Sequence, residues 1–118
     1  MEKRNIIREK SFEFALEIID LYKKMLAEKE YVISKQILRA ATSVGANVEE
    51  AIAGASRKDF IYKLVIAQKE ARESCYWLKL LQKSTLVSIN VSQNLNKADE
   101  IVRILTAIVK TSQTTNLS

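Results

Sequence analysis

Apolar residues recur at steps of three and four along four stretches of the chain, which is the period of an amphipathic helix, and strand-type alternation is nearly absent. The stretches run from about residue 11 to 28, 34 to 53, 57 to 83 and 91 to 112, with short polar breaks between them. This pattern predicts an all-α chain folded as an antiparallel up-down-up-down four-helix bundle. We expect residues 1–118 to form one domain, because the length suits a single core and the absence of proline argues against linkers.

The predicted core joins the apolar stripes of the four helices. These stripes consist of Phe12, Phe14, Ala15, Ile18, Ile19, Leu21, Tyr22, Met25 and Leu26; Ile37, Ala40, Ala41, Val44, Val48, Ala51 and Ile52; Phe60, Leu64, Ala67, Ala71, Cys75 and Leu78; and Leu95, Ala98, Val102, Leu105 and Val109. Ser11 is placed to cap the first helix, Gly54 to end the second, and Ser56 to cap the third with Asp59 three residues later. The polar tail beyond residue 112 is expected to fray.

Gly45 stands inside the second predicted helix. A glycine there costs about 0.5–1 kcal/mol relative to alanine, so a structural reason for it is expected. Neighbouring alanines suit the close approach of another backbone, and a bend at Gly45 would also account for it. The pattern leaves both explanations open.

A second apolar set lies on the third predicted helix. Tyr62, Ile66, Trp77 and Leu80 fall opposite the core stripe on a helical wheel of 100° per residue. Single exposed apolar residues are ordinary, but four on one line are more typical of a subunit interface. We therefore expect the chain to form a homo-oligomer through this face.

The second predicted helix carries a polar row at steps of three and four, formed by Gln36, Arg39, Ser43, Asn47 and Glu50. Such a row is usually a solvated face. The alternative is a binding surface or a hydrogen-bonded subunit contact, in which Arg39 binds phosphate or carboxylate through two hydrogen bonds.

Nineteen Lys and Arg against fourteen Asp and Glu give a net charge of +5, which favours polyanionic partners such as nucleic acid. The cations are spread along every segment, so an ordinary solvated surface also explains them. No apolar run approaches the roughly 20 residues of a membrane span, and the N-terminus lacks the apolar stretch of a signal peptide. We expect a cytoplasmic protein without a membrane partner.

Catalytic and metal sites find little support in the sequence. The chain has no His, which excludes Ser-His-Asp and Cys-His catalysis and His-containing metal sites. Glu70 and Glu73 lie off the predicted core face, unlike the ligands of a di-iron bundle, and Cys75 lies on the core stripe, where a thiol behaves as a small hydrophobe. We expect no enzymatic activity, no cofactor and no metal.

The run SKQILRAATSVGANVEEAIAGASRKDFIYKLVIAQKEARESCYWLKLL resembles the four-helix-bundle family of 23S rRNA intervening-sequence proteins, and the likeness extends from SFEFALEIIDLYKKM to about residue 110. The residues that fit the family pattern in register are Gln36, Ile37, Arg39, Ala40, Ala41, Ser43, Ala46, Asn47, Glu50, Ser56 and Phe60. Gly45 occupies a place where the family commonly has proline, so the resemblance implies a helix irregularity there. Leu38 replaces a common Arg and Ala51 a usual Gly, which implies a weaker basic surface on this helix.

The resemblance implies a bundle that assembles as a ring, a pentamer in known relatives, in agreement with the second apolar face. Relatives are encoded within insertions of bacterial 23S rRNA genes. A related branch, the accessory variability proteins of diversity-generating retroelements, contacts a reverse transcriptase and nucleic acid. The family name records gene location more than activity.

Our leading hypothesis is a non-enzymatic, ring-shaped homo-oligomer that binds structured RNA electrostatically, because assembly multiplies the phosphate contacts of a weakly charged protomer. The candidate contacts are Lys3, Arg4, Arg8, Lys35, Arg39, Arg57 and Lys58. The alternative is a protein-interaction scaffold for a partner such as a reverse transcriptase, since no RNA-recognition motif is present. A helix-turn-helix DNA reader has less support, because its third helix would be apolar on both sides.

Overall fold

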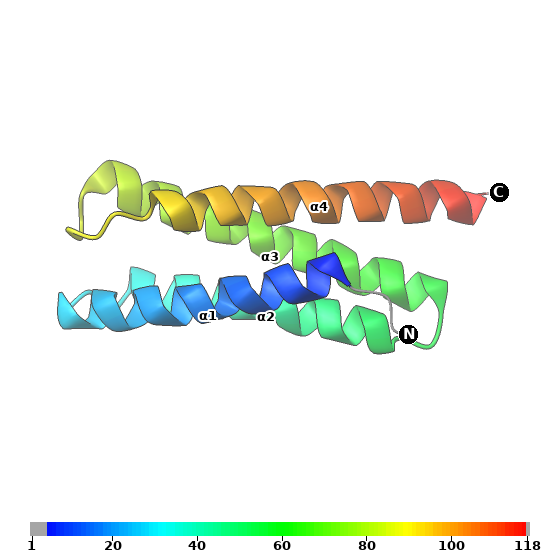
Figure 1. Cartoon of the computed structure of the whole chain (residues 1–118), viewed down its shortest axis with the longest axis horizontal. Helices are drawn as coiled ribbons and strands as arrows, with labels where there is room; N and C mark the ends of the chain where they lie inside the picture. Colours follow the sequence, from blue (N-terminus) through cyan, green and yellow to red (C-terminus); the bar gives the residue numbers. More distant parts are fainter. Residues whose placement is uncertain (1–4, 118) are drawn as a thin grey trace.

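The computed structural model describes residues 5–117, and the regular structure within that range is helical, with no strand. The four helices are α1 (Ile6–Ala27), α2 (Ile33–Ala53), α3 (Arg57–Ser84) and α4 (Ser92–Leu117). Figure 1 shows all of them running along the long axis of a body with extents of 50 × 27 × 21 Å. The prediction of an all-α chain with four helices is therefore confirmed.

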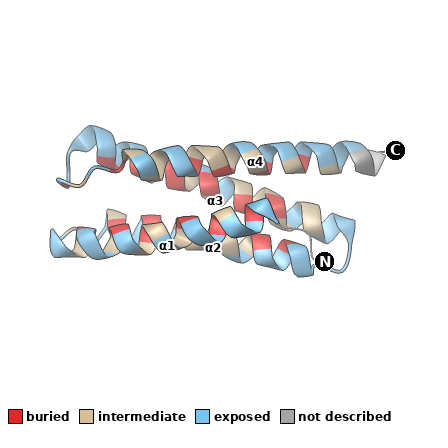
Figure 2. Ribbon diagram, in the orientation of Figure 1, coloured by how far each residue is buried: buried red, intermediate tan, exposed pale blue. Residues whose placement is uncertain are grey.

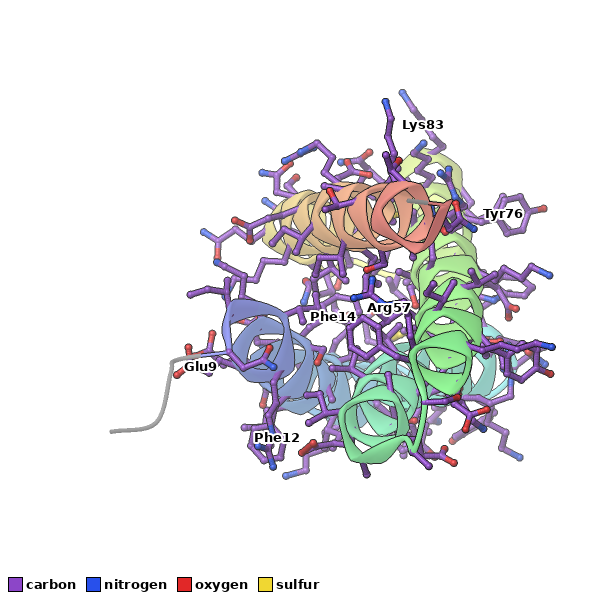
Figure 3. All side chains as sticks on the ribbon, turned by 90° about the vertical axis from the view of Figure 1, so that its right-hand side faces the viewer. Glu9, Phe12, Phe14, Arg57, Tyr76 and Lys83 are labelled. Carbon is purple, nitrogen blue, oxygen red and sulfur yellow. The ribbon has the colours of Figure 1, made fainter. Side chains whose placement is uncertain are left out.

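Each helix packs on the helix that follows it, and α1 also contacts α4. The end-on view in Figure 3 shows the four helices around a shared centre, with Phe14 pointing into it. In Figure 2 the buried positions lie on the inward side of the ribbons. The contact between α1 and α4 is the least extensive of the four, and the ion pairs Lys10–Glu100 and Lys97–Glu17 bridge it.

Burial confirms most of the predicted core. The predicted positions that are buried are Phe14, Ile18, Leu21, Met25, Ile37, Ala40, Ala41, Val44, Val48, Ala51, Leu64, Ala67, Ala71, Cys75, Leu78, Ala98, Leu105 and Val109. Phe12 and Ile52 were wrongly assigned to the core, since they are 64% and 39% exposed. The inward stripe of α1 is narrower than the pattern predicts, because only one helix face meets α2 and α4.

Two predicted helix ends are wrong. Helix α1 begins before Ser11: Asn5 is its N-cap, and the Asn5 side chain accepts a hydrogen bond of 3.0 Å from the backbone N–H of Arg8. Ser11 is instead buried within α1, where its hydroxyl donates to the backbone carbonyl of Arg8. At the other end of the chain, α4 continues to Leu117 and does not end near residue 112.

The caps predicted for the second and third helices are confirmed. The Ser56 hydroxyl accepts a hydrogen bond of 3.1 Å from the backbone N–H of Asp59, and Gly54 is the C-cap of α2. Glu30 supplies a cap that the pattern did not indicate: its carboxylate accepts hydrogen bonds from the backbone N–H groups of Ile33 and Ser34 at 3.1 and 2.7 Å. These bonds satisfy donors that the first turn of α2 leaves without helical partners.

Gly45 lies where α1 approaches α2. A Cβ atom placed on Gly45 would be 3.4 Å from the backbone carbonyl oxygen of Ser11 and 3.7 Å from its hydroxyl. Of the two explanations that the sequence left open, the structure therefore supports the close approach of another backbone.

Candidate nucleic-acid interface

Arg39, which belongs to the polar row on α2, forms an ion-pair network with α3. One guanidinium nitrogen lies 2.9 Å from the Glu70 carboxylate, and a second nitrogen donates to Glu73. The hydrogen bond to Glu73, followed by that to Glu70, raises the pKa of Arg39. Both charged branches of this side chain are therefore engaged within the chain, so a phosphate would have to compete with two carboxylates.

Trp77 completes this network from one turn further along α3. Its indole Nε1–H donates a hydrogen bond of 2.9 Å to the same Glu73 carboxylate. This hydrogen bond is the largest cause that lowers the pKa of Glu73, and Arg39 adds to it against the opposing effect of burial. The Glu73 carboxylate therefore links a cation on α2 to the indole on α3.

Other members of the polar row also make contacts within the chain. The Asn47 amide donates to the backbone carbonyl of Ser43 at 2.9 Å, and Glu50 accepts from Lys63 of α3 at 3.3 Å. Gln36 is exposed near the start of α2. Arg39 and Glu50 therefore join α2 to α3. The spacing of the row along α2 does not indicate which helix it contacts.

Two other candidate cations contact neighbouring helices. Arg8 pairs with Glu49 of α2 at 2.9 Å, and Arg57 lies 3.5 Å from the backbone carbonyl of Ser112. Figure 3 shows Arg57 directed toward the interior at the end of the bundle. Arg8 is therefore neutralised by an acidic partner, whereas Arg57 contacts a carbonyl dipole and forms no ion pair within residues 5–117.

Lys35 and Lys58 are the candidate contacts left most available. Both are exposed, and neither has an ion pair among residues 5–117. Lys3 and Arg4 lie outside the described residues. The candidate cations therefore differ in availability. Within the described residues, carboxylates pair with Arg8 and Arg39 but not with Lys35 or Lys58.

The second apolar set on α3 is only partly exposed. Tyr62 is 62% exposed and Leu80 37%, whereas Ile66 and Trp77 are half-buried and Trp77 packs against the core. Tyr76 was missed by the sequence analysis: it is 56% exposed, and its ring meets that of Trp77 in a T-shaped contact with centroids 5.2 Å apart. Its position 14 residues after Tyr62, about four helical turns, was the available signal.

Three further exposed cations on α3 were also missed. Arg72, Lys79 and Lys83 lie seven and four residues apart, and Tyr76 falls between the first two. Their heptad-like spacing could be seen in the sequence, but a count of charges over the whole chain does not show which cations share a helix face.

Cys75 has the environment of an inert thiol. Its Sγ donates a hydrogen bond of 3.3 Å to the Asp99 carboxylate of α4. Burial, followed by this hydrogen bond, raises the pKa of Cys75 to about 12. Because the thiolate is the nucleophilic form, the arrangement disfavours nucleophilic chemistry.

Within residues 5–117, no group of three or more His, Cys, Asp or Glu side chains is placed to hold a metal ion. No helix in that part of the chain has both the length and the apolar character needed to cross a membrane.

Comparison with known proteins supports the resemblance noted from the motifs. A crystal structure at 1.70 Å resolution from Bacteroides thetaiotaomicron, of a protein with unknown function from the S23 ribosomal protein family, superposes with a TM-score of 0.84. It shares 46% sequence identity over 90% of this chain and 96% of its own. No match was found among curated proteins. The family model for the 23S rRNA-intervening sequence protein matches residues 3–107. The chain therefore belongs to the family of 23S rRNA-intervening sequence proteins.

Proposed function

We propose that this protein is a non-enzymatic homo-oligomer that binds structured RNA through contacts between surface cations and phosphates. The observation that carries this proposal is the unequal pairing of charges on the surface. Within residues 5–117, six Lys or Arg side chains pair with seven carboxylates, and the whole sequence has fourteen acidic residues. Other acidic groups are bound as well, such as Glu28 to Ser88 and Asp99 to Cys75.

The cations are more numerous than their partners. Exposed Lys and Arg side chains that form no ion pair within residues 5–117 include Lys23, Lys29, Lys35, Lys58, Lys69, Arg72, Lys79, Lys83, Arg103 and Lys110. A surface of this kind attracts a polyanion, because each phosphate contact releases condensed counterions.

Assembly is the second part of the proposal. We expect the protomer, an antiparallel up-down-up-down bundle, to form a ring, with a pentamer as the expected size. The exposed Tyr62 and Leu80 on α3 support a subunit contact there. A ring would place several copies of each weakly charged protomer surface on one RNA and so raise the overall affinity.

Among the candidate contacts, Lys35 and Lys58 carry the proposal furthest, because neither has to leave a carboxylate in order to meet a phosphate. Arg57 can contribute from the start of α3. Arg8 and Arg39 would each first lose an ion pair. The cytoplasmic location predicted from the sequence is retained as part of this proposal.

The test is fluorescence anisotropy with a labelled structured RNA and a duplex DNA of matched length, at several salt concentrations. We expect micromolar or tighter RNA binding that weakens steeply with salt, and weaker binding by Lys35→Gln/Lys58→Gln. Light scattering on the same samples checks that the oligomer is intact. An intact oligomer that binds neither polymer would overturn the RNA-binding function, and a monomer at micromolar concentration would overturn the ring.

The alternative function is a protein-interaction scaffold for a partner such as a reverse transcriptase. The exposed pair Phe12 and Leu16, one helical turn apart on α1, favours it. Figure 3 shows Phe12 on the outer side of α1, whereas Phe14 points to the centre. Capture of one defined protein by the wild type, lost in Phe12→Ser/Leu16→Ser, together with an absence of RNA binding, would favour the scaffold.

A further inference from the structure

A line of cations follows the side of α3 that faces α4. Arg72, Lys79 and Lys83 are exposed on α3, and Arg103 is exposed on α4. None of the four forms an ion pair with any residue in the described range. From residue 72 to residue 83 the line extends about 16 Å at the rise of an α-helix.

These side chains share one surface. Arg72, Tyr76 and Lys79 of α3 line a shallow hollow of about 230 Å³ together with Asp99 and Val102 of α4. Arg103 is four residues after Asp99, so the two lie on neighbouring positions of the same face of α4.

Two hydrogen bonds show which part of α3 lies beside Arg103 of α4. Cys75 donates to Asp99, and Gln68 donates to Thr106 at 2.8 Å. Arg103 lies between Asp99 and Thr106 on α4, as Arg72 lies between Gln68 and Cys75 on α3. The two arginines are therefore level with each other across the seam between the helices.

The charge of α3 is distributed asymmetrically around its axis. Glu70 and Glu73 bind Arg39 on the side that faces α2, and on α4 Glu100 binds Lys10 of α1. The carboxylate that lines the hollow, Asp99, accepts a hydrogen bond from Cys75. Around the hollow, four cations therefore accompany a single lining carboxylate, that of Asp99.

Tyr76 adds an aromatic ring to this line of cations. Its side chain is 56% exposed, and Figure 3 shows it extending away from the bundle, as Lys83 does. Cations that follow a backbone, combined with an exposed aromatic ring on which a base can stack, are the features of a single-strand binding surface. Duplex nucleic acid presents its phosphates but not its base faces, so Tyr76 favours an unpaired strand.

We propose that an unpaired segment of RNA binds along the α3–α4 seam, with its phosphates at Arg72, Lys79, Lys83 and Arg103 and one base stacked on Tyr76. This inference rests on the RNA-binding function proposed above and adds to it a second surface, for an unpaired segment, apart from Lys35 and Lys58. That surface lies on the α4 side of the subunit contact proposed at Tyr62 and Leu80.

The first test compares two variants that each remove two positive charges. Arg72→Gln/Lys79→Gln alters the seam, and Lys23→Gln/Lys29→Gln alters exposed cations on α1 and the turn that follows it. The probe is a labelled 20-nucleotide oligouridine, measured by anisotropy over a range of salt concentrations, with circular dichroism and light scattering as checks on fold and assembly. We expect the seam variant to bind at least about tenfold more weakly and its salt slope to fall by about 1.4, from two lost single-strand phosphate contacts.

The second test isolates stacking. Tyr76→Leu keeps the charge and an apolar side chain, and is expected to weaken oligouridine binding roughly fivefold or more while leaving binding to an RNA duplex of equal length unchanged. Equal losses for the seam and control variants, or equal effects of Tyr76→Leu on both probes, would overturn the seam assignment while RNA binding stands. A wild type that binds neither RNA would overturn the proposed function itself.

Discussion

The backbone carbonyl oxygen of Ser11 on α1 lies 3.4 Å from the point where a Cβ on Gly45 of α2 would stand. Ser11 is buried, and its hydroxyl is turned back to the carbonyl of Arg8 in its own helix. The two helices therefore meet through small groups at this crossing. Gly45 therefore stands at a helix crossing, opposite a residue 34 positions earlier in the chain, where a side chain larger than a methyl group would meet the α1 backbone.

Gly45→Ala tests how tight this crossing is. Because a contact of 3.4 Å is ordinary for a Cβ, the added methyl group fits, and alanine should raise the free energy of unfolding by about 0.5–1 kcal/mol through helix propensity. Gly45→Leu should lower it by about 1–3 kcal/mol, because the larger side chain must displace the α1 backbone. Urea denaturation at one fixed protein concentration measures both, and destabilisation by alanine would show that the crossing has no spare room.

Arg39→Ala should act on stability more than on RNA affinity. Arg39 is half exposed and engaged with Glu70 and Glu73, so its loss should lower the free energy of unfolding by only about 0.5–1 kcal/mol. RNA binding should change less than it does for Lys35→Ala, which removes a cation with no ion pair in the described chain. Anisotropy of both variants decides this, and a greater affinity loss for Arg39→Ala would place that guanidinium on the RNA.

Acid titration of Trp77 fluorescence should report the ionisation of Glu73. Hydrogen bonding to Trp77 and Arg39 lowers the pKa of Glu73 in the folded chain, so these contacts contribute stability at neutral pH. That contribution is lost as the pH falls through the lowered folded-state pKa, below the usual glutamate range. Since Trp77 is the only tryptophan, we expect one emission change with a midpoint below that range.

Glu73→Gln is the matched control for the titration, because it keeps the shape of the side chain and removes the ionisation. The emission change at that midpoint should disappear in this variant. A wild-type midpoint within or above the usual glutamate range would contradict the hydrogen-bonded network.

Cys75 should react slowly with iodoacetamide. With its pKa raised to about 12, only about one thiol in 10⁴ is ionised at pH 8. Labelling followed by mass spectrometry should be at least about 100-fold slower than for Cys75→Ser/Thr111→Cys, whose thiol is on an exposed position of α4. Asp99→Asn should speed the labelling of Cys75, because it removes the negative charge that opposes ionisation. Equal rates for wild type and control would show that Cys75 is accessible and ionised.

The helices and most of the core could be predicted from the sequence alone. Helical periodicity is a local property, so positions such as Val44, Leu64 and Leu78 could be assigned to the core from spacing alone. The cap of α3 at Ser56 was equally local, since it joins residues three apart. The same reasoning misplaced Phe12, because an apolar stripe shows which side of a helix is hydrophobic but not how much of that side a neighbour covers.

Which cations are available to a partner depends on how the helices pack. Arg8 and Arg39 are held by carboxylates 41 and at least 31 residues away, whereas Arg72 and Lys79 have no such partner within the described chain. Pairing between charges depends on distances across the bundle, which helix packing sets and no local pattern records. The approach of the α1 backbone to Gly45 depends on helix packing for the same reason. So does the placement of Arg72 and Arg103 at the same height on neighbouring helices.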